Sequence, residues 1–420
     1  MGSTDGTGIK IPSKLRLFLS LDIVGSTEFK HPRGAKAPSD GDSWVDPFLA
    51  FYRVSVDQMA VQWELVVEEL KAAANGSNFF KFGKGPEFWK GAGDEVLFTK
   101  LVKSPLDAVA AVRSLILVMA DIGRLFARND RTKVLAVKGT AWLAGFPLNN
   151  TEIVLGAQNG PEVDDPLTEN YRLLAQLDKK SKQRGSYKVD YIGPSIDLGF
   201  RLCQRATPRR MMVSADLAWL VCHVYRQVGN AGADKCPSLE KPKIGFDGRV
   251  ALKGLLGGEA YPLFWIEAVA GSRMDNVEDR LLKRPAHVEH DDVRKFCKEF
   301  LDQSGPLRTK PYIDGYTASE LGKRTPDRQK RLRELEERVN KTVIGIKEEK
   351  EDIAGTRGNA TVGAKKVPSR PKAFAMDAAG VVQAKKALKS RKTAPRPSPA
   401  PKKKKKRSPK SAAKGRKPKK

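Results

Sequence analysis

The chain has 420 residues, of which 40% are hydrophobic and 30% charged, and its formal net charge is +28. This apolar content is enough for a substantial core, and the length allows two or three average domains. No run approaches the ~20 apolar residues of a membrane-spanning helix, and the N-terminus lacks the features of a secretory signal. Four cysteines without CxxC pairing exclude a disulfide-stapled scaffold. We therefore expect a cytoplasmic protein.

The first 146 residues alternate strands with amphipathic helices. "LRLFLSLDIV" is apolar at nearly every position, which is typical of a central strand, whereas apolar residues three and four apart indicate helices. The expected elements are a strand at 15–24, a helix at 45–73, two strands within 88–101, a helix at 105–127 and a strand at 133–146. The order β-α-β-β-α-β predicts a ferredoxin-like α/β (α+β) layer with helices on one sheet face.

The next segments complete the predicted body. Residues 147–188 are polar and rich in Gly, Asn and Asp, and we expect a long inserted loop with a short helix near 169–177. In "DYIGPSIDLGFRLCQRA", Ile196, Phe200 and Cys203 share one helical stripe. A short strand "RMMVS", a helix from Ala215 and a hairpin within 250–267 follow.

The composition changes twice after the body. We expect a flexible N-terminus at 1–13, a folded domain at 14–268, a charged helical region at 269–352 and a disordered Lys-rich tail at 353–420. From Thr361 onward, 22 Lys and Arg stand against one acid, so the tail carries most of the excess charge. Such a tail would bind nucleic acid without sequence preference.

An acid ends the first predicted strand. Asp22 is followed at once by Gly25, Ser26 and Thr27, which allow close backbone approach to a phosphate. A second acid, Asp94, lies in the turn of "WKGAGDEVLF". If the two strands are neighbours, both carboxylates reach one locus, the geometry of a two-metal site. Either acid alone is more simply explained as a turn or capping residue.

Four segments occur together and in order: "LDIVGST", "WKGAGDEVLF", "DYIGPSIDLGFRL" and "LKGLLGGEAYPLFWIE". In this arrangement, residues 15–267 resemble the class III nucleotidyl cyclase catalytic domain, the fold of adenylate and guanylate cyclases. The resemblance implies a phosphorus-oxygen lyase with two divalent ions, Mn²⁺ or Mg²⁺, at each site. It also implies a homodimer whose chains pair head to tail. The metal aspartates of one chain would face the base-reading residues, the arginine and the lysine of the other chain.

The same resemblance implies a role for each residue of the set. Asp22 and Asp94 match the metal aspartates, and Ile23 would add its carbonyl oxygen. Lys90 and Asp190 match the base-reading pair, Arg201 the arginine that stabilises the reacting phosphate, and Lys253 the lysine on the terminal phosphates. Gly25, Ser26 and Thr27 would contact substrate. Asp197 departs from the family, which usually has Asn at this position to orient the ribose.

The residues themselves do not identify the base of the substrate. A donor at Lys90 and an acceptor at Asp190 suit adenine or cytosine, and uracil offers its groups in the opposite order. "DIVGSTEFK" and "FWKGAGDEVLF" are most similar to the bacterial pyrimidine (uridylate or cytidylate) cyclases of anti-phage Pycsar systems, which implies UTP or CTP as substrate. The alternatives are an adenylate cyclase, or a degenerate cyclase-like body acting as a nucleic-acid-binding protein through its tail.

Overall fold

The structure is a computed structural model. It describes residues 8–31, 44–73, 82–156, 165–179, 187–228, 240–283, 287–303, 305, 307–317 and 320–358. Residues 359–420 of the predicted tail and Cys236 lie outside these residues. Residues 353–358, predicted to belong to the disordered tail, are helical instead. Cys203, Cys222 and Cys297 are buried free thiols. No described helix is long and apolar enough to cross a bilayer.

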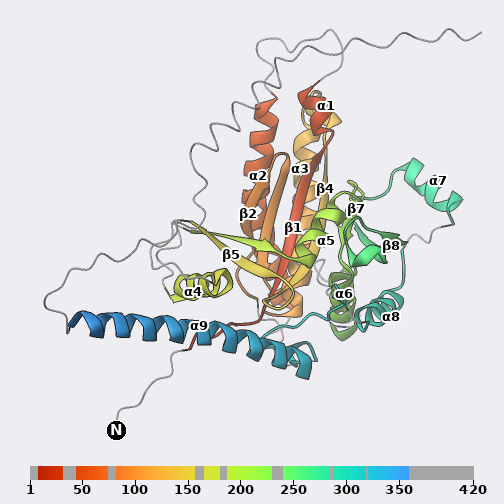
Figure 1. Ribbon diagram of the computed structural model, residues 1–420. Helices are drawn as coiled ribbons and strands as arrows, with labels where there is room; N and C mark the ends of the chain where they lie inside the picture. The colour runs from red at the N-terminus through yellow and green to blue at the C-terminus, as the bar shows by residue number, and fades with distance from the viewer. Residues whose placement is uncertain are drawn as a thin grey trace, which may run out of the picture. The chain divides into compact units, whose positions relative to one another are not determined.

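The elements of the first half follow the predicted order (Figure 1). They are β1 (Lys14–Val24), α1 (Ser26–Lys30), α2 (Val45–Ala73), β2 (Glu87–Ala92), β3 (Glu95–Leu101), α3 (Pro105–Ala127), a 3-10 turn (Thr132–Val134) and β4 (Ala136–Phe146). β1 pairs antiparallel with both β3 and β4, and β2 pairs antiparallel with β3. The resulting strand order β2-β3-β1-β4 confirms the ferredoxin-like βαββαβ core.

Three further strands extend this sheet beyond β4 to seven in the order β2-β3-β1-β4-β7-β9-β8. They are β7 (Arg210–Val213), which runs parallel to β4, and β9 (Ala260–Glu267) and β8 (Ile244–Ala251), which form the predicted hairpin. The 3-10 turn Leu256–Gly258 lies between β8 and β9. β8 begins six residues before the predicted start at residue 250.

The two helices of the predicted core lie on one face of the sheet, as predicted, but the opposite face is covered as well. Leu17, Leu19 and Leu21 of β1 are buried in the core that includes α2, α3 and α6 (Ala215–Val228). Phe18, on the opposite face, is buried in a second cluster with Trp142 and with residues of α5 (Pro194–Cys203). Because side chains alternate along a strand, the nearly continuous apolar run of β1 requires partners on both sides.

Helix α5 lies unusually close to β4. A Cβ atom on Gly199 would stand 2.1 Å from Cε2 of Trp142, so only glycine permits this approach. Ile196, Phe200 and Cys203 pack in the cluster around Trp142, which confirms the predicted helical stripe. The glycine therefore fixes the distance of α5 from the sheet, and with it the positions of Asp197 and Arg201 on that helix.

The inserted segment contains more regular structure than predicted. β5 (Thr151–Gly156) pairs antiparallel with β6 (Tyr187–Ile192) as a separate two-stranded sheet, and α4 (Pro166–Lys179) includes the predicted short helix. The loop prediction was therefore wrong for 151–156. The β-branched residues of "TEIVLG" favour a strand, but its partner lies more than 30 residues later, beyond the reach of local pattern analysis.

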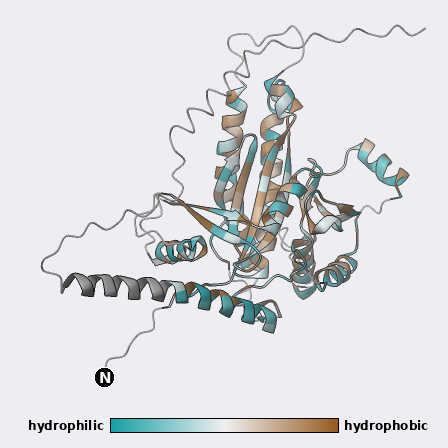
Figure 2. Ribbon diagram, in the orientation of Figure 1, coloured by the Kyte–Doolittle hydropathy of each residue, from teal (hydrophilic) through white to brown (hydrophobic). Residues whose placement is uncertain are grey.

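The charged region after the body is helical, as predicted. It comprises α7 (Arg273–Leu281), α8 (His290–Leu301), a 3-10 turn (Glu320–Gly322) and α9 (Pro326–Gly358). Cys297 and Phe300 of α8 join the main core, and Val339 of α9 packs against Ile11 and Tyr171. Figure 2 shows the central strands as predominantly hydrophobic and the coloured part of α9 as predominantly hydrophilic.

Asp216, at the start of α6, gives the fold a pH dependence. Burial raises its pKa to about 6, although Ser214 and the Leu217 amide donate hydrogen bonds to its Oδ1. The folded chain therefore holds a proton that the unfolded chain loses near pH 4, and the stability contributed by that proton disappears as pH rises from about 4 to 6. Asp216→Asn should remove this loss, worth up to about 3 kcal/mol.

The measurement is the free energy of unfolding of wild type and Asp216→Asn at pH 4 and pH 7.5, by urea titration. The variant is expected to gain stability relative to wild type at the higher pH. Asp57→Asn, which changes an exposed acid on α2, is the matched control and should give no such gain. A constant difference between Asp216→Asn and wild type at the two pH values would contradict the assignment.

Candidate active site

Strand pairing brings Asp22 and Asp94 to one end of the sheet. Asp22 stands opposite Glu95 in the β1–β3 register, and the Ile23 amide donates a hydrogen bond to the Asp94 carbonyl oxygen at 3.2 Å. Asp94 itself occupies the β2–β3 turn, where Gly93 has φ of +73°. The two aspartates predicted from the sequence therefore share one locus.

Two lysines and a serine contact these carboxylates. Lys138 Nζ lies 3.1 Å from Asp22 Oδ2, and Lys30 Nζ lies 4.0 Å from Asp94 Oδ2. The Ser26 hydroxyl donates to Asp94 Oδ2. Sequence reasoning missed Lys138, although an isolated charge on the apolar strand β4 was a usable signal.

Tyr52 of α2 holds the turn that carries Asp94. Its hydroxyl donates to the Gly93 carbonyl oxygen at 3.0 Å. A Cβ on Gly91 would stand 2.6 Å from the same hydroxyl oxygen, so glycine is needed for the tyrosine to enter. The two glycines of "KGAGD" thus have separate purposes: one admits Tyr52, and the other, Gly93, forms the turn.

Negative charge accumulates at this locus. Burial raises the pKa of Asp22, and the neighbouring Asp94 raises it further against the opposing effect of Lys138. Burial also raises the pKa of Glu95, with a contribution from Asp22, and the pKa of Tyr52, with contributions from Asp94 and Glu95. Groups that disfavour each other's ionised form in this way favour a bound cation.

The donor set fits Mg²⁺ or Mn²⁺. These ions prefer oxygen ligands, and Mg²⁺ is commonly held by one or two carboxylates together with substrate phosphates. Asp22, Asp94 and the Ile23 carbonyl would supply the protein oxygens. Within the described ranges there is no group of three or more His, Cys, Asp and Glu side chains that could hold a metal alone. Substrate oxygens would therefore have to complete the coordination.

The predicted phosphate-contacting segment forms the very short helix α1. Gly25 caps it with φ of +85°, and Ser26 is buried and bonded to Asp94, while Thr27 is exposed. The serine hydroxyl therefore supports the aspartate here. The role of Gly25 and Thr27 toward a substrate remains a prediction.

Lys90 and Asp190 meet, as the family resemblance implied. Lys90 Nζ lies 3.0 Å from Oδ1 and 3.2 Å from Oδ2 of Asp190, and the indole N–H of Trp89 donates to the same Oδ1 at 3.0 Å. Adjacent strand residues normally point to opposite faces, but the β2–β3 register shifts between Phe88 and Lys90. This irregularity lets both Trp89 and Lys90 reach one carboxylate.

The pair lies in the wall of a cavity of about 780 Å³ between the sheet edge, α4 and β6. The same wall carries Lys14, Arg16 and Glu152, with Lys14 at 2.6 Å and Arg16 at 2.9 Å from the carboxylate of Glu152. Burial alone would raise the pKa of Glu152, but the two cations lower it below its ordinary value. Sequence reasoning missed this cluster because Glu152 belongs to the unpredicted strand β5.

The remaining predicted residues lie on α5 and in the turn after β8. Asp197 is exposed and Arg201 partly buried on α5, and Lys253 is exposed in the turn after β8. Within the described parts of the chain, no hydrogen bond or ion pair connects these three side chains to Asp22 or Asp94. The thiol of Cys203, the last residue of α5, is hydrogen-bonded to Glu95, so the helix that carries Asp197 and Arg201 ends beside the aspartate locus.

Lys253 is far from Asp22 because β8 and β1 are far apart in the sheet. β8 is four strands from β1, which at about 4.8 Å per strand places them about 19 Å apart. The pairing registers also show that β8 ends, at Ala251 beside Ala260, near the end of the sheet where β1 begins. Asp22 is near the other end of the sheet, where β1 ends. A lysine side chain does not span this distance, so one chain alone does not bring Lys253 to the aspartates.

No family model matches the chain, and no curated protein matches its sequence. Among solved structures, it is similar to the adenylyl cyclase CyaB from P. aeruginosa (TM-score 0.37, 16% identity, 63% of this chain and 97% of that one). It is also similar to the guanylyl cyclase Cya2, with a TM-score of 0.33, 11% identity, and coverage of 62% of this chain and 95% of that one. A third similar structure is the guanylate cyclase domain of RhGC from Catenaria anguillulae, with a TM-score of 0.34, 12% identity, and coverage of 62% of this chain and 100% of that one.

Proposed function

We propose that the protein is a nucleotidyl cyclase, which converts a nucleoside triphosphate to a 3′,5′-cyclic monophosphate and diphosphate. The observation that carries this proposal is the meeting of Asp22 and Asp94 at the ends of neighbouring strands. The Lys90–Asp190 pair supports it, because a donor beside an acceptor can read the edge of a base.

Each residue has a chemical task in this reaction. The ribose 3′-oxygen forms a bond to the α-phosphorus, the bond from that phosphorus to the diphosphate oxygen breaks, and the hydroxyl proton leaves to solvent. Asp22, Asp94 and the Ile23 carbonyl would hold two divalent ions, which activate the hydroxyl and stabilise the leaving group. Arg201 and Lys253 would neutralise phosphate charge, and Asp197 would accept a hydrogen bond from the ribose.

The active unit is a homodimer with two equivalent sites. A single chain keeps Lys253 far from the aspartates, whereas a second copy placed head to tail would present its own Arg201 and Lys253 to them. Each chain then supplies the metal-binding half of one site and the phosphate-binding half of the other.

The substrate in this proposal is UTP or CTP, and the cyclic pyrimidine product is a second messenger of anti-phage defence. The support is the similarity of "DIVGSTEFK" and "FWKGAGDEVLF" to pyrimidine cyclases. A cavity of about 780 Å³ admits purines and pyrimidines alike, so its volume does not choose between them.

Substrate choice is tested by incubating the protein with equimolar ATP, GTP, CTP and UTP and Mn²⁺, and identifying the cyclic products by mass spectrometry. Cyclic UMP or cyclic CMP should dominate. Cyclic AMP as the main product would remove the pyrimidine assignment and leave the cyclase. The absence of every cyclic product would remove the cyclase.

Lys90→Met should lower kcat/KM for the preferred nucleotide about 10- to 100-fold, because a charge-assisted hydrogen bond of about 1.5–3 kcal/mol is lost. The measurement is steady-state kinetics with each triphosphate. Lys84→Met, which changes an exposed lysine just before β2, is the matched control and should leave kcat/KM unchanged. An unchanged preference in Lys90→Met would show that this lysine does not read the base.

A further inference from the structure

A second large cavity, of about 610 Å³, has none of the residues proposed for catalysis among the described residues that line it. The segment after α8 and the first turns of α9 form most of its wall. The β4–β5 turn contributes Leu148 and Asn149, and α6 contributes Trp219. The cavity therefore forms where the appended helical region meets the body.

The wall of this cavity is rich in cations. Six are Arg308, Lys310, Lys323, Arg324, Arg328 and Arg331. Among the described residues, two acids, Asp302 and Asp327, line the same space. Such a wall attracts anions, and arginine in particular presents a planar fork of donors that matches phosphate and carboxylate oxygens.

Four of the six cations have acidic partners. Arg308 pairs with Glu259, Lys310 with Asp302 at 2.5 Å, Arg324 with Asp314 at 2.8 Å and Arg331 with Asp327 at 4.0 Å. Lys323 and Arg328 have no ion-pair partner among the described residues. Two positive charges are therefore left uncompensated in the wall.

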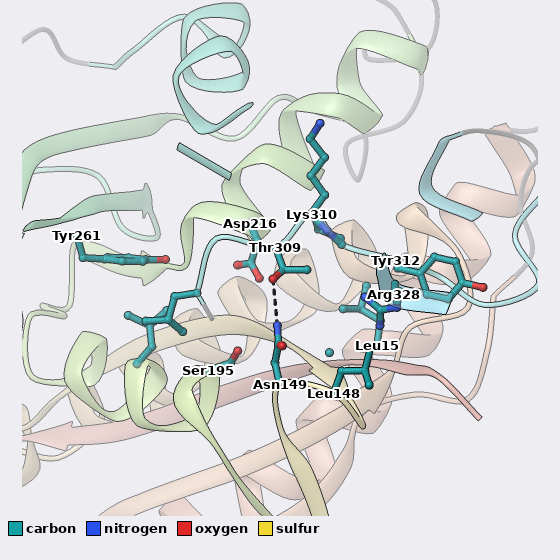
Figure 3. A pocket seen from close by; sticks show the side chains of 14 residues that line it. Leu15, Leu148, Asn149, Ser195, Asp216, Tyr261, Thr309, Lys310, Tyr312 and Arg328 are labelled. Atoms are coloured by element: carbon teal, nitrogen blue, oxygen red, sulfur yellow. Dashed lines mark hydrogen bonds between the residues drawn. The ribbon is translucent and has the colours of Figure 1, made fainter. Parts of the chain in front are cut away.

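Of these two cations, Arg328 is partly buried and Lys323 is exposed. The guanidinium carbon of Arg328 lies 4.7 Å from the centre of the Tyr312 ring, and its Nε has no hydrogen-bond partner within the described part of the chain. Burial lowers its pKa, and the neighbouring charges of Arg324 and Arg331 lower it further, against the opposing effects of Tyr312 and Asp314. Figure 3 shows Arg328 beside Tyr312, near the hydrogen bond from Asn149 to Thr309, in a smaller adjoining pocket.

A partly buried cation without a counter-ion is costly, and a bound anion would remove that cost. The two uncompensated charges match a phosphate monoester, which carries about −1.5 to −2 at neutral pH. We propose that this cavity binds the phosphate group of a small phosphorylated molecule, with Arg328 and Lys323 as its principal ligands. The site is independent of the proposed catalytic residues.

The test is hydrogen–deuterium exchange of the full chain with EDTA present, with inorganic phosphate and uridine 5′-monophosphate as separate probes. Both probes should slow exchange in peptides covering 307–317 and 320–331. Tighter binding of the monophosphate would identify a phosphorylated molecule as the ligand, and equal binding would identify phosphate itself. Reading these peptides separates the cavity from the basic tail.

Arg328→Gln should raise the probe concentration needed for half-maximal protection at least tenfold, and Arg328→Lys should restore part of the affinity. Lys323→Gln, at an exposed position, should raise that concentration about threefold. This variant provides the test if Arg328→Gln does not fold. Lys330→Gln, on α9 but outside the cavity wall, is the control and should change nothing.

The double variant Asp22→Ala/Asp94→Ala should keep the protection, because it alters only the proposed catalytic site. Protection that disappears in this double variant, or that is equal in wild type, Arg328→Gln and Lys323→Gln, would overturn the proposal. Neither result would bear on the cyclase assignment.

Discussion

Replacing Asp22 or Asp94 by alanine is expected to lower the rate of cyclisation at least about a thousandfold. Divalent ions supply several kcal/mol of stabilisation to the charge that develops during phosphoryl transfer, and about 4 kcal/mol corresponds to a thousandfold in rate. Asp22 and Asp94 are the two carboxylates proposed to hold the ions, so removing either leaves too few protein ligands for them. The measurement is kcat at saturating Mn²⁺, together with the Mn²⁺ concentration needed for half-maximal rate.

The control for this loss is Glu28→Ala, which removes an exposed acid from α1 without touching either aspartate. It should retain wild-type activity. Thermal unfolding of Asp22→Ala and Asp94→Ala should show an intact fold, because neither residue is part of the hydrophobic core. Folded variants that still cyclise at near wild-type rates would contradict the assignment of these residues.

Mixing two inactive variants is expected to restore activity. Asp94→Ala destroys the metal-binding half of each site, and Arg201→Ala destroys the phosphate-binding half. In a mixed dimer, one of the two sites then combines two intact halves. Random pairing of equal amounts makes half of the dimers mixed, so about a quarter of wild-type activity should return, at least 100-fold above either variant alone.

The negative control for this experiment mixes Asp22→Ala with Asp94→Ala. Both changes damage the same half, so every site in the mixed dimer remains defective and no activity should return. Recovery in this control, or no recovery with Asp94→Ala and Arg201→Ala after the subunits have exchanged, would show that the site is not shared between two chains.

The sequence predicted the central sheet because its signals are local. The apolar run of β1 and the helical spacing of α2 and α3 are each contained within one element, and Ser104 at the start of α3 forms a complete capping box with Asp107. The strand β5 and the covering of the second face by α5 depend on partners distant in sequence. These features were missed for that reason.

In the candidate site, too, some features were predicted and others depend on contacts between distant parts of the chain. The Lys90–Asp190 pair was predicted from a family resemblance, and the structure brings the two side chains together. The contacts of Lys138 with Asp22 and of Trp89 with Asp190 depend on the β1–β4 register and on the irregular β2–β3 pairing, which no local pattern shows. The charge cluster around Arg328 likewise arises from the packing of the appended region on the body.

The most direct test of the cyclase assignment is to incubate wild-type protein with UTP and, separately, with CTP in the presence of Mn²⁺, and to quantify the cyclic nucleotide and the diphosphate together. We predict equal molar amounts of the two products from at least one triphosphate, and none of either after EDTA is added. Diphosphate or phosphate released without cyclic nucleotide, from these or from ATP and GTP, would contradict the assignment.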